Sequence, residues 1–381
     1  PDPQGISETA SLFDATLFMT EQGYHHIPVL TDTHHLGVSE PSDQLPVRVA
    51  GIVTASDLML ARQDDPVFLV QHIRRESSLE GLKAIVQQLT NLLVQWEHAG
   101  VRAYQISRIL TAISDAVTRR LIDLTIKDLG EAPVPFCWLG FGSQGRGEQL
   151  LGADQDNGLL ISDTLKDDDK PWFTELANRV CDGLNTCGYV YCKGFIMAGS
   201  DEWRQLLWRW CQTVDRWTRS PTKDAVMRVS IFFDLRSVYG EESLCEQLQQ
   251  HMLKRAGENS IFLAALAENV LDAPPPLGIF RRFVVEHDGE HRDHLNLKKR
   301  AVLPIVDTAR IHCLANNITA VNTLERLQAL ADARVLTIGE SRNLQDAWSI
   351  IMQMRVEAQS QQIVAADDIS NYLNPDKLSK L

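Results

Sequence analysis

The sequence has no excess of positive charge. It contains 37 Lys and Arg residues against 50 Asp and Glu residues, which gives a formal net charge of −13 over 381 residues. Proteins that bind nucleic acid broadly need a basic surface to neutralise phosphates, so nucleic acid is not an expected partner. A nucleotide is still compatible with an acidic chain, because a divalent cation can neutralise its phosphates.

The sequence also lacks paired cysteine motifs and long apolar runs. Its seven cysteines include no CxxC pair, which favours reduced, buried thiols in a cytoplasmic protein over a disulfide or zinc framework. No apolar run reaches the ~18–20 residues that a membrane helix needs, so no membrane partner is expected. The chain starts with Pro1-Asp2-Pro3, without an initiator methionine or a signal-peptide core, and we expect it to be an excerpt of a longer protein.

The hydrophobic pattern divides the chain into four regions and predicts an α+β fold. We expect a small α/β unit at 1–65, a helical linker at 66–130, a mixed-sheet domain at 131–258 and a C-terminal helical bundle at 259–381.

Within these regions the pattern also predicts individual elements. Strands are expected at 26–30, 47–53, 134–139, 157–161 and 229–235, and helices at 9–22, across 66–130, at 173–184 and across 299–360. The polar tail from Asp367 onward is expected to be loosely held.

A glycine-rich turn follows the predicted strand 134–139. Its sequence is Gly140-Phe141-Gly142-Ser143-Gln144-Gly145-Arg146-Gly147-Glu148. Glycine permits tight or left-handed backbone geometry and lets amide groups approach a phosphate closely. Ser143 adds a hydroxyl donor, and Arg146 adds a forked cation that suits phosphate oxygens. We therefore expect Gly142, Ser143 and Arg146 to bind a nucleotide; a surface charge is the alternative for Arg146, and a structural pairing with Arg146 is one role open to Glu148.

Two aspartates stand two positions apart at the head of the predicted strand 157–161. Side chains at i and i+2 point to the same face of a strand, so Asp154 and Asp156 should lie together. Their repulsion is costly unless a cation lies between them, and Mg²⁺ prefers such oxygen ligands. The sequence therefore predicts a Mg²⁺ site here, with Mn²⁺ as an alternative cation; two solvated acids in a turn are the simpler interpretation.

A third carboxylate is expected from the predicted strand 229–235. Asp234 follows the apolar run Ile231-Phe232-Phe233, where a charge is unexpected. Three carboxylates beside a phosphate-binding turn suit two-metal phosphoryl transfer. We expect Asp234 to bind metal and to help deprotonate the attacking hydroxyl, although an ordinary strand-end acid is the alternative. Arg236 either binds the nucleotide or neutralises Asp234.

The combination Gly142-Ser143 with Asp154-x-Asp156 resembles the signature of the DNA polymerase β-like nucleotidyltransferase superfamily. The longer strings at 142–149 and 154–157 resemble more specifically the DUF294 nucleotidyltransferases, which are relatives of PII uridylyltransferase and glutamine-synthetase adenylyltransferase. The segments 192–198, 233–236 and 297–306 fit the same family, and the resemblance covers about residues 66–360. It implies a mixed-sheet catalytic domain, metal-binding aspartates at 154, 156 and 234, and a helical C-terminal domain on the substrate side.

The N-terminal region resembles one CBS motif. The resemblance rests on His26-Ile27-Pro28-Val29 and on Gly51-Ile52-Val53-Thr54-Ala55-Ser56-Asp57-Leu58. In that family the Thr and Asp at these places hold the ribose and phosphate of an adenine nucleotide, which implies a regulatory site at Thr54 and Asp57. Capping of the next helix is the alternative role for both residues. CBS motifs come in pairs, so we expect the second motif upstream or on the other chain of a homodimer.

These observations favour a Mg²⁺-dependent nucleotidyltransferase. The expected reaction moves a nucleoside monophosphate from a nucleoside triphosphate (NTP) to an acceptor hydroxyl, for example on a regulatory protein, with adenine nucleotides sensed by the CBS-like unit. The alternative is a catalytically weak, nucleotide-binding signalling protein. A small-molecule acceptor is a third hypothesis.

Overall fold

The computed structural model describes residues 5–31, 48–54, 66–271 and 294–373 of the chain. The N-terminal unit has a three-stranded sheet in the order β1-β2-β3, with β1 parallel to β2 and β2 antiparallel to β3. Its elements are β1 (Ile6–Ser7), α1 (Leu12–Gln22), β2 (His26–Thr31) and β3 (Arg48–Thr54). The helix and the two strands predicted in this region are therefore confirmed, with small shifts at their ends.

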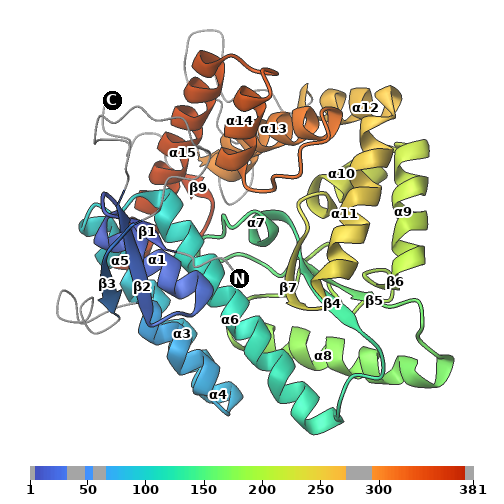
Figure 1. Cartoon of the computed structure of the whole chain (residues 1–381), viewed down its shortest axis with the longest axis horizontal. Coiled ribbons are helices and arrows are strands. Elements are labelled where there is room, and N and C mark those ends of the chain that lie inside the picture. Colours follow the sequence, from blue (N-terminus) through green and yellow to red (C-terminus); the bar gives the residue numbers. More distant parts are fainter. Residues whose placement is uncertain (1–4, 32–47, 55–65, 272–293, 374–381) are drawn as a thin grey trace.

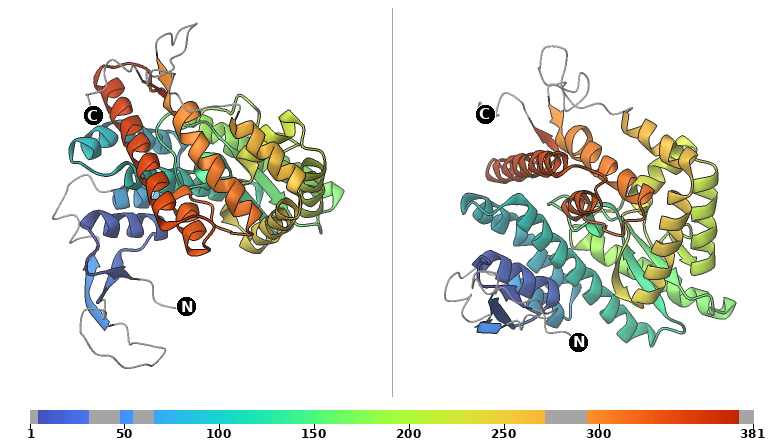
Figure 2. Two further views of the ribbon diagram at one scale, coloured as in Figure 1. Left: turned by 90° about the horizontal axis from the view of Figure 1, so that it is seen from above. Right: turned by 45° about the horizontal axis from the view of Figure 1, so that its top comes forward.

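Helix α1 begins three residues later than predicted because of its capping residues. The Ser11 hydroxyl accepts a hydrogen bond from the Asp14 backbone N–H at 3.1 Å, and the Asp14 carboxylate accepts one from the Ser11 N–H at 3.0 Å. This reciprocal capping box satisfies backbone donors that the first helical turn leaves without partners. Figure 2 shows the unit packed through α1 while its strands lie on the outside of the molecule.

The region 66–130 is helical, as predicted. It contains α3 (Pro66–Arg75), α4 (Leu79–Gln87), α5 (Leu89–His98) and α6 (Ala103–Leu129). Helix α6 runs beside the central sheet and contacts α1 on one side and α8 (Lys170–Thr186) on the other (Figure 1). None of the described helices is long and apolar enough to cross a membrane.

The central domain is built on a four-stranded mixed sheet in the order β6-β5-β4-β7. Strand β4 is antiparallel to both of its neighbours, and β5 is parallel to β6. The strands are β4 (Phe136–Gly140), β5 (Asn157–Ile161), β6 (Arg204–Leu206) and β7 (Arg236–Gly240). The predicted strand 157–161 is confirmed at both ends, and the predicted strand 134–139 is confirmed with a shift of one or two residues.

Alternate residues of β4 and β5 face two separate apolar cores. Phe136, Trp138 and Leu159 pack with α6 and α8, whereas Cys137 and Leu160 pack with the helices on the opposite face. Those helices are α9 (Leu207–Arg219), α10 (Lys223–Phe232) and α11 (Glu242–Gly257). Both faces of the sheet are therefore covered, which accounts for the nearly continuous apolar character of its two central strands, β4 and β5.

The prediction of a strand over 229–235 is wrong. The Thr222 hydroxyl accepts a hydrogen bond from the Ala225 N–H and caps α10, which continues to Phe232. The apolar residues of this stretch recur at intervals of three and four and are buried: Val226, Val229, Phe232 and Phe233. The pattern is that of a buried helix face, and a short apolar run does not distinguish such a face from a strand. Strand β7 begins only at Arg236.

The C-terminal part is helical, as predicted for 299–360. It contains α12 (Ser260–Leu271), a π-helical turn η3 (Lys298–Val302), α13 (Leu303–Ala315), α14 (Thr323–Asp332) and α15 (Ile338–Val364). The segment that follows is held more firmly than expected: β9 (Tyr372–Leu373) pairs with β8 (Leu295–Asn296). Leu373 is buried, which gives this short strand an apolar anchor.

A buried cluster of charged side chains joins the C-terminal helices to the central domain. Asp234 lies between α10 and β7, and none of its surface is exposed to solvent. Its carboxylate accepts hydrogen bonds from Arg310 Nε of α13 at 2.8 Å and from Arg326 Nη1 of α14 at 2.6 Å. Arg146 Nη1, at the end of the glycine-rich turn, lies 2.5 Å from the same carboxylate.

Two further acids complete this cluster. Glu148 pairs with Arg146 at 2.8 Å, and Asp307 pairs with Arg310. Three acids thus neutralise three arginines, and the cluster is sealed from solvent except for part of Asp307. Burying charges costs desolvation free energy. The hydrogen bonds between the arginines and the acids of this cluster offset that cost.

We expect Asp234→Asn to destabilise the protein by about 3–5 kcal/mol, because the substitution leaves arginine charges buried without their shared partner. Urea or thermal unfolding of the full chain measures this loss. The matched control is Glu175→Gln, which removes an exposed i,i+4 pair with Arg179. We expect that control to cost less than about 0.5 kcal/mol; equal effects of the two substitutions would contradict a supporting role for the cluster.

The difference in unfolding free energy between wild type and Asp234→Asn should depend on pH in one direction. Burial alone would raise the pKa of Asp234, but Arg310, Arg326 and Arg146 hold it well below its usual range. A carboxyl with a depressed folded-state pKa contributes stability that is fully present above its unfolded pKa and is lost as pH falls towards the folded pKa. The gap between wild type and Asp234→Asn should therefore be constant above about pH 5 and shrink only in acid.

Candidate active site

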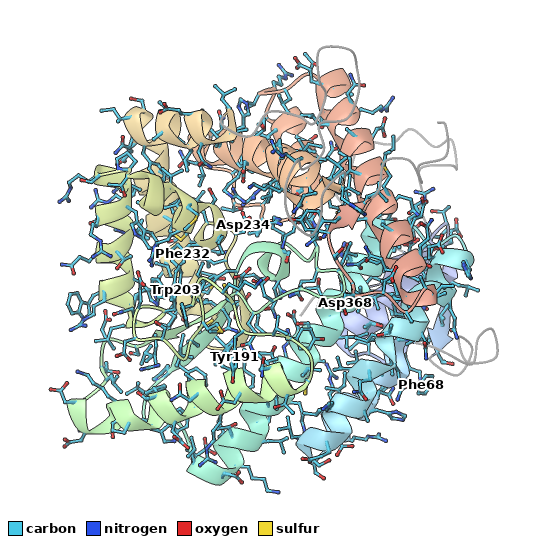
Figure 3. All side chains as sticks on the ribbon, turned by 180° about the vertical axis from the view of Figure 1, so that it is seen from behind. Phe68, Tyr191, Trp203, Phe232, Asp234 and Asp368 are labelled. Atoms are coloured by element: carbon cyan, nitrogen blue, oxygen red, sulfur yellow. The ribbon has the colours of Figure 1, made fainter. Side chains whose placement is uncertain are left out.

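The glycine-rich turn is fixed by an aromatic cluster beneath it. Strand β4 ends at Gly140, and the short helix α7 (Gly142–Gly145) follows directly. Phe141, between them, is fully buried with its ring 5.3 Å from that of Phe232 and 5.5 Å from that of Trp203. Figure 3 labels Trp203 and Phe232 close together, with Asp234 beside them towards the C-terminal helices. The turn therefore has a rigid base on the core.

Asp154 and Asp156 flank a buried glutamine just before β5. The Gln155 side chain donates to the carbonyl oxygens of Cys181 and Tyr189, each at 2.9 Å. Because Gln155 is directed into the core, its two neighbours face the opposite way and are half-buried. The backbone N–H of Phe141 donates to the Asp156 carbonyl oxygen at 2.9 Å, which ties the acidic pair to the turn.

The structure brings the two predicted aspartates together and adds a cysteine. Ligand atoms of Asp154, Asp156 and Cys192 all lie within 4.8 Å of one another. Burial and the nearby Asp154 carboxylate raise the pKa of Asp156 to about 6, so its charged form is less favourable than that of an ordinary aspartate. A divalent cation would relieve both effects, and two carboxylates at such spacing fit one.

Gly142 makes room for this acidic pair. Its φ is +52°, a left-handed conformation that favours glycine, and a Cβ atom there would lie 3.2 Å from Asp156 Oδ2. The sequence analysis explained glycine at position 142 by its backbone freedom. The structure adds a second explanation, because a side chain at this position would crowd the Asp156 carboxylate.

The neighbouring Ser143 is half-buried and lines a small cavity of about 20 Å³. The other polar side chains that line this cavity are those of Arg146, Glu148, Lys298, Arg355 and Asn371. Three elements distant in sequence, the turn, η3 and α15, thus meet at this cavity, which Ala153, the residue before Asp154, also lines.

The two arginines expected to bind nucleotide are engaged elsewhere. Arg146 is buried and pairs with Glu148 and Asp234, so the structural pairing considered for Glu148 is what the structure contains. Arg236 donates to the Gly145 carbonyl oxygen at 3.3 Å and lies 2.8 Å from the Asp115 carboxylate of α6. Both side chains therefore hold the turn in place through contacts within the protein.

Asp234 does not lie where the third metal ligand was expected. Among the described residues the three-member ligand cluster contains Cys192 and not Asp234. The Asp234 carboxylate is occupied by three arginines, and a Cβ atom on Gly145 would meet the Asp234 carbonyl oxygen at 1.7 Å. In this arrangement the contacts of Asp234 hold the turn to the C-terminal helices, and its metal-binding and base roles stay predictions.

Some contacts within the site could not be predicted from the sequence. Arg310 and Arg326 are buried charges within otherwise apolar helix faces, a signal that marks an ion-pair partner but does not identify it. Cys192 was noted only as part of a family segment. Of the predicted regulatory pair, Thr54 ends β3, and Asp57 lies outside the described residues.

Comparison with known families agrees with this geometry. Residues 87–224 match the family described as Putative nucleotidyltransferase DUF294, residues 260–381 match the Putative nucleotidyltransferase substrate binding domain, and residues 1–64 match the CBS domain. No match was found among curated proteins. The chain thus carries a DUF294 region, followed by the substrate binding domain described for that family and preceded by a CBS domain.

Proposed function

We propose that this protein is a Mg²⁺-dependent nucleotidyltransferase that moves a nucleoside monophosphate from an NTP to an acceptor hydroxyl. The observation that carries the proposal is the convergence of Asp154 and Asp156 on one side of a glycine turn that is rigidly seated on the core. Asp154 and Asp156 would hold the cation, with Mn²⁺ as the alternative to Mg²⁺. When bound, the cation supplies charge neutralisation at the phosphates and at the leaving pyrophosphate.

The chain's own residues account for binding and orientation. The Gly142 backbone leaves space beside Asp156, and the Ser143 hydroxyl lies next to it on the cavity wall. Arg146 and Arg236 act as positioning residues, because their bonds to Asp234, Gly145 and Asp115 keep the turn in place. A rigid turn holds the reacting phosphate in one geometry, and this is the main source of rate in phosphoryl transfer.

A second candidate function is supported by one observation. Asp234 is neutralised by arginines, so only two carboxylates remain for the cation among the described residues. A protein with this feature could bind nucleotides and signal with little turnover. The two candidates differ in whether pyrophosphate is released from the bound NTP.

For the acceptor we propose a protein hydroxyl, as the resemblance to PII uridylyltransferase implies. Incubation of the chain and Mg²⁺ with labelled ATP or UTP in an extract of the host, followed by separation of macromolecules from small molecules, tests this. Label on a discrete protein supports the proposal, whereas label recovered only in a small molecule indicates the third hypothesis.

We also propose that adenine nucleotides bound by the CBS domain regulate the transfer. Helix α1 of this domain contacts α6 through Glu21, which pairs with Arg108 at 2.8 Å. Further along α6, Asp115 accepts a hydrogen bond from Gln144 of the turn at 3.1 Å. A cavity of about 690 Å³ lies between α1, α6 and the turn. Because α6 contacts both α1 and the turn, a shift of α1 would be transmitted to the turn through α6.

Asp154→Asn and Asp156→Asn should each lower Mg²⁺-dependent pyrophosphate release by about 100-fold or more, because each removes charge that holds the cation. Release from each NTP is measured with a coupled phosphate assay. Asp167→Asn is the control, since its carboxylate is exposed on η2 (Asp167–Asp169) and does not belong to the cluster of Asp154, Asp156 and Cys192. Nucleotide binding by the wild type without any release would favour the signalling candidate.

Gly142→Ala should impair transfer far more than Gly147→Ala. Both glycines have positive φ, +52° and +72°, so each substitution carries a similar backbone penalty of about 1–2 kcal/mol. A Cβ atom at 147 has open space, whereas at 142 it crowds Asp156. We expect at least about tenfold lower kcat/KM for Gly142→Ala than for Gly147→Ala, with similar losses of stability. Equal kinetic effects would show that the contact with Asp156 is irrelevant.

Adenine nucleotides should change the transfer rate by about fivefold or more. Asp57→Ala and Thr54→Ala should remove this response, measured as the ratio of rates with and without AMP or ATP. Arg108→Met should preserve nucleotide binding at the CBS domain and reduce the ratio, because it breaks the pair with Glu21. A ratio of one in the wild type would exclude the regulatory proposal.

A further inference from the structure

The cavity of about 690 Å³ beside α6, called the α6 cavity below, is a second candidate for a ligand site. Its walls come from α1, α6, β7, the glycine turn and the start of α14. Such a volume is typical of sites for small molecules. The side chains of Asp154, Asp156 and Cys192 do not line it, so it is distinct from the candidate metal site.

Four arginines line the α6 cavity, and three of them are paired with acids of the protein. Arg108 holds both carboxylate oxygens of Glu21, at 2.8 and 3.0 Å. Arg236 lies 2.8 Å from the Asp115 carboxylate. Arg146 belongs to the buried ion cluster of the overall fold. These three side chains therefore have little charge left to offer a ligand.

The fourth arginine, Arg119 of α6, forms no ion pair with any described residue. Its Nε donates to the Val238 carbonyl oxygen of β7 at 2.7 Å, and its two Nη nitrogens have no hydrogen-bond partner within the described ranges. The backbone contact fixes the guanidinium at the cavity wall. The edge formed by the two Nη nitrogens is thus left for a ligand.

The charge of Arg119 is incompletely balanced by its surroundings. Burial lowers the pKa of Arg119, and Asp115, which opposes this effect, is already paired with Arg236. Arg236 and Arg74 lower the pKa further by repulsion. An anion in the α6 cavity would relieve that repulsion, because an opposite charge favours the charged form of the guanidinium.

Two exposed acids restrict which anion fits. Glu242 and Glu325 line the same cavity. Their carboxylates repel an ion with more than one negative charge, such as inorganic phosphate, but they accept hydrogen bonds from hydroxyl groups. Ala112 and Val321 add apolar wall that suits a carbon skeleton. The lining therefore favours an organic anion with one charge and several hydroxyl groups.

We propose that the α6 cavity binds a small hydroxylated organic acid, with its single carboxylate on the Nη edge of Arg119. A carboxylate forms two charge-assisted hydrogen bonds with such an edge. The bound acid contacts α1, α6 and the turn, so it acts as an effector at a site separate from that of the CBS nucleotide. This inference goes beyond the transfer reaction and does not depend on it.

The probe is gluconate, titrated calorimetrically into the full chain without Mg²⁺ or nucleotide. We expect saturable binding of gluconate, and no binding of sorbitol, which has a similar chain of hydroxyl groups but no carboxylate. Inorganic phosphate should bind at least about tenfold more weakly than gluconate, because Glu242 and Glu325 repel its second charge. Absence of gluconate binding, or equal affinity for phosphate, would overturn the proposal.

Substitution of Arg119 assigns the binding to this cavity. We expect Arg119→Met to lower gluconate affinity by about tenfold or more, through loss of the charge-assisted bonds. Arg120→Met is the matched control and should leave the affinity unchanged. Arg120 is the next residue of α6, is also half-buried, and its Nε also donates to a backbone carbonyl oxygen, that of Glu76 at 2.5 Å, but it does not line the cavity. Equal affinities of the two variants would contradict the proposal.

Thermal unfolding shows whether each variant folds. If Arg119→Met does not fold, Arg119→Lys keeps the positive charge but loses the planar fork. A lower gluconate affinity of Arg119→Lys then supports the proposal, and an unchanged affinity overturns it.

These titrations need no turnover, so their outcome is independent of the transferase. Arg119-dependent gluconate binding in a chain that releases no pyrophosphate from NTPs would support the effector site and contradict the proposed reaction. Pyrophosphate release that requires Asp154 and Asp156, in a chain that does not bind gluconate, would contradict the effector site alone.

Discussion

The position of the glycine turn depends on the ion cluster around Asp234. Arg146 stands at the end of the turn, and its charge is shared by Glu148 and Asp234. The Glu148 carboxylate also accepts the backbone N–H of Thr323 at 2.7 Å, at the start of α14, where a helix N-terminus favours a negative group. The turn, the strand-linking residue Asp234 and two C-terminal helices therefore form one charge-balanced unit.

This arrangement separates two kinds of buried charge. Asp234 and the arginines that contact it satisfy one another, so they contribute geometry and have little left to offer a ligand. Asp154 and Asp156 repel each other, and Arg355 forms no ion pair in the described part of the chain, although Glu148 lines the same cavity. Charges that the protein leaves unbalanced are the ones that a metal–nucleotide complex can balance.

The sequence was sufficient for much of the fold and for half of the candidate site. Local signals placed β5, the glycine turn and the acidic pair correctly, because a two-residue spacing and a strand boundary are both local properties. The surroundings of Asp234 were not predicted, for two reasons. The apolar run before it belongs to a helix, and its partners Arg310 and Arg326 are 76 and 92 residues away, a separation that no local pattern bridges.

The global and local charges of the chain act on different ligands. A net charge of −13 repels extended polyanions, whose attraction depends on a broad basic surface. At the junction of the two domains, however, Lys298 and Arg355 gather within one cavity. The attraction between these cations and a nearby phosphate is strong because the dielectric constant inside the protein is low. The repulsion from the distant acidic surface is weaker, because solvent and salt screen it. The cations at this internal junction therefore fit the small phosphate ligand proposed above as substrate, an NTP, even though the chain as a whole is acidic.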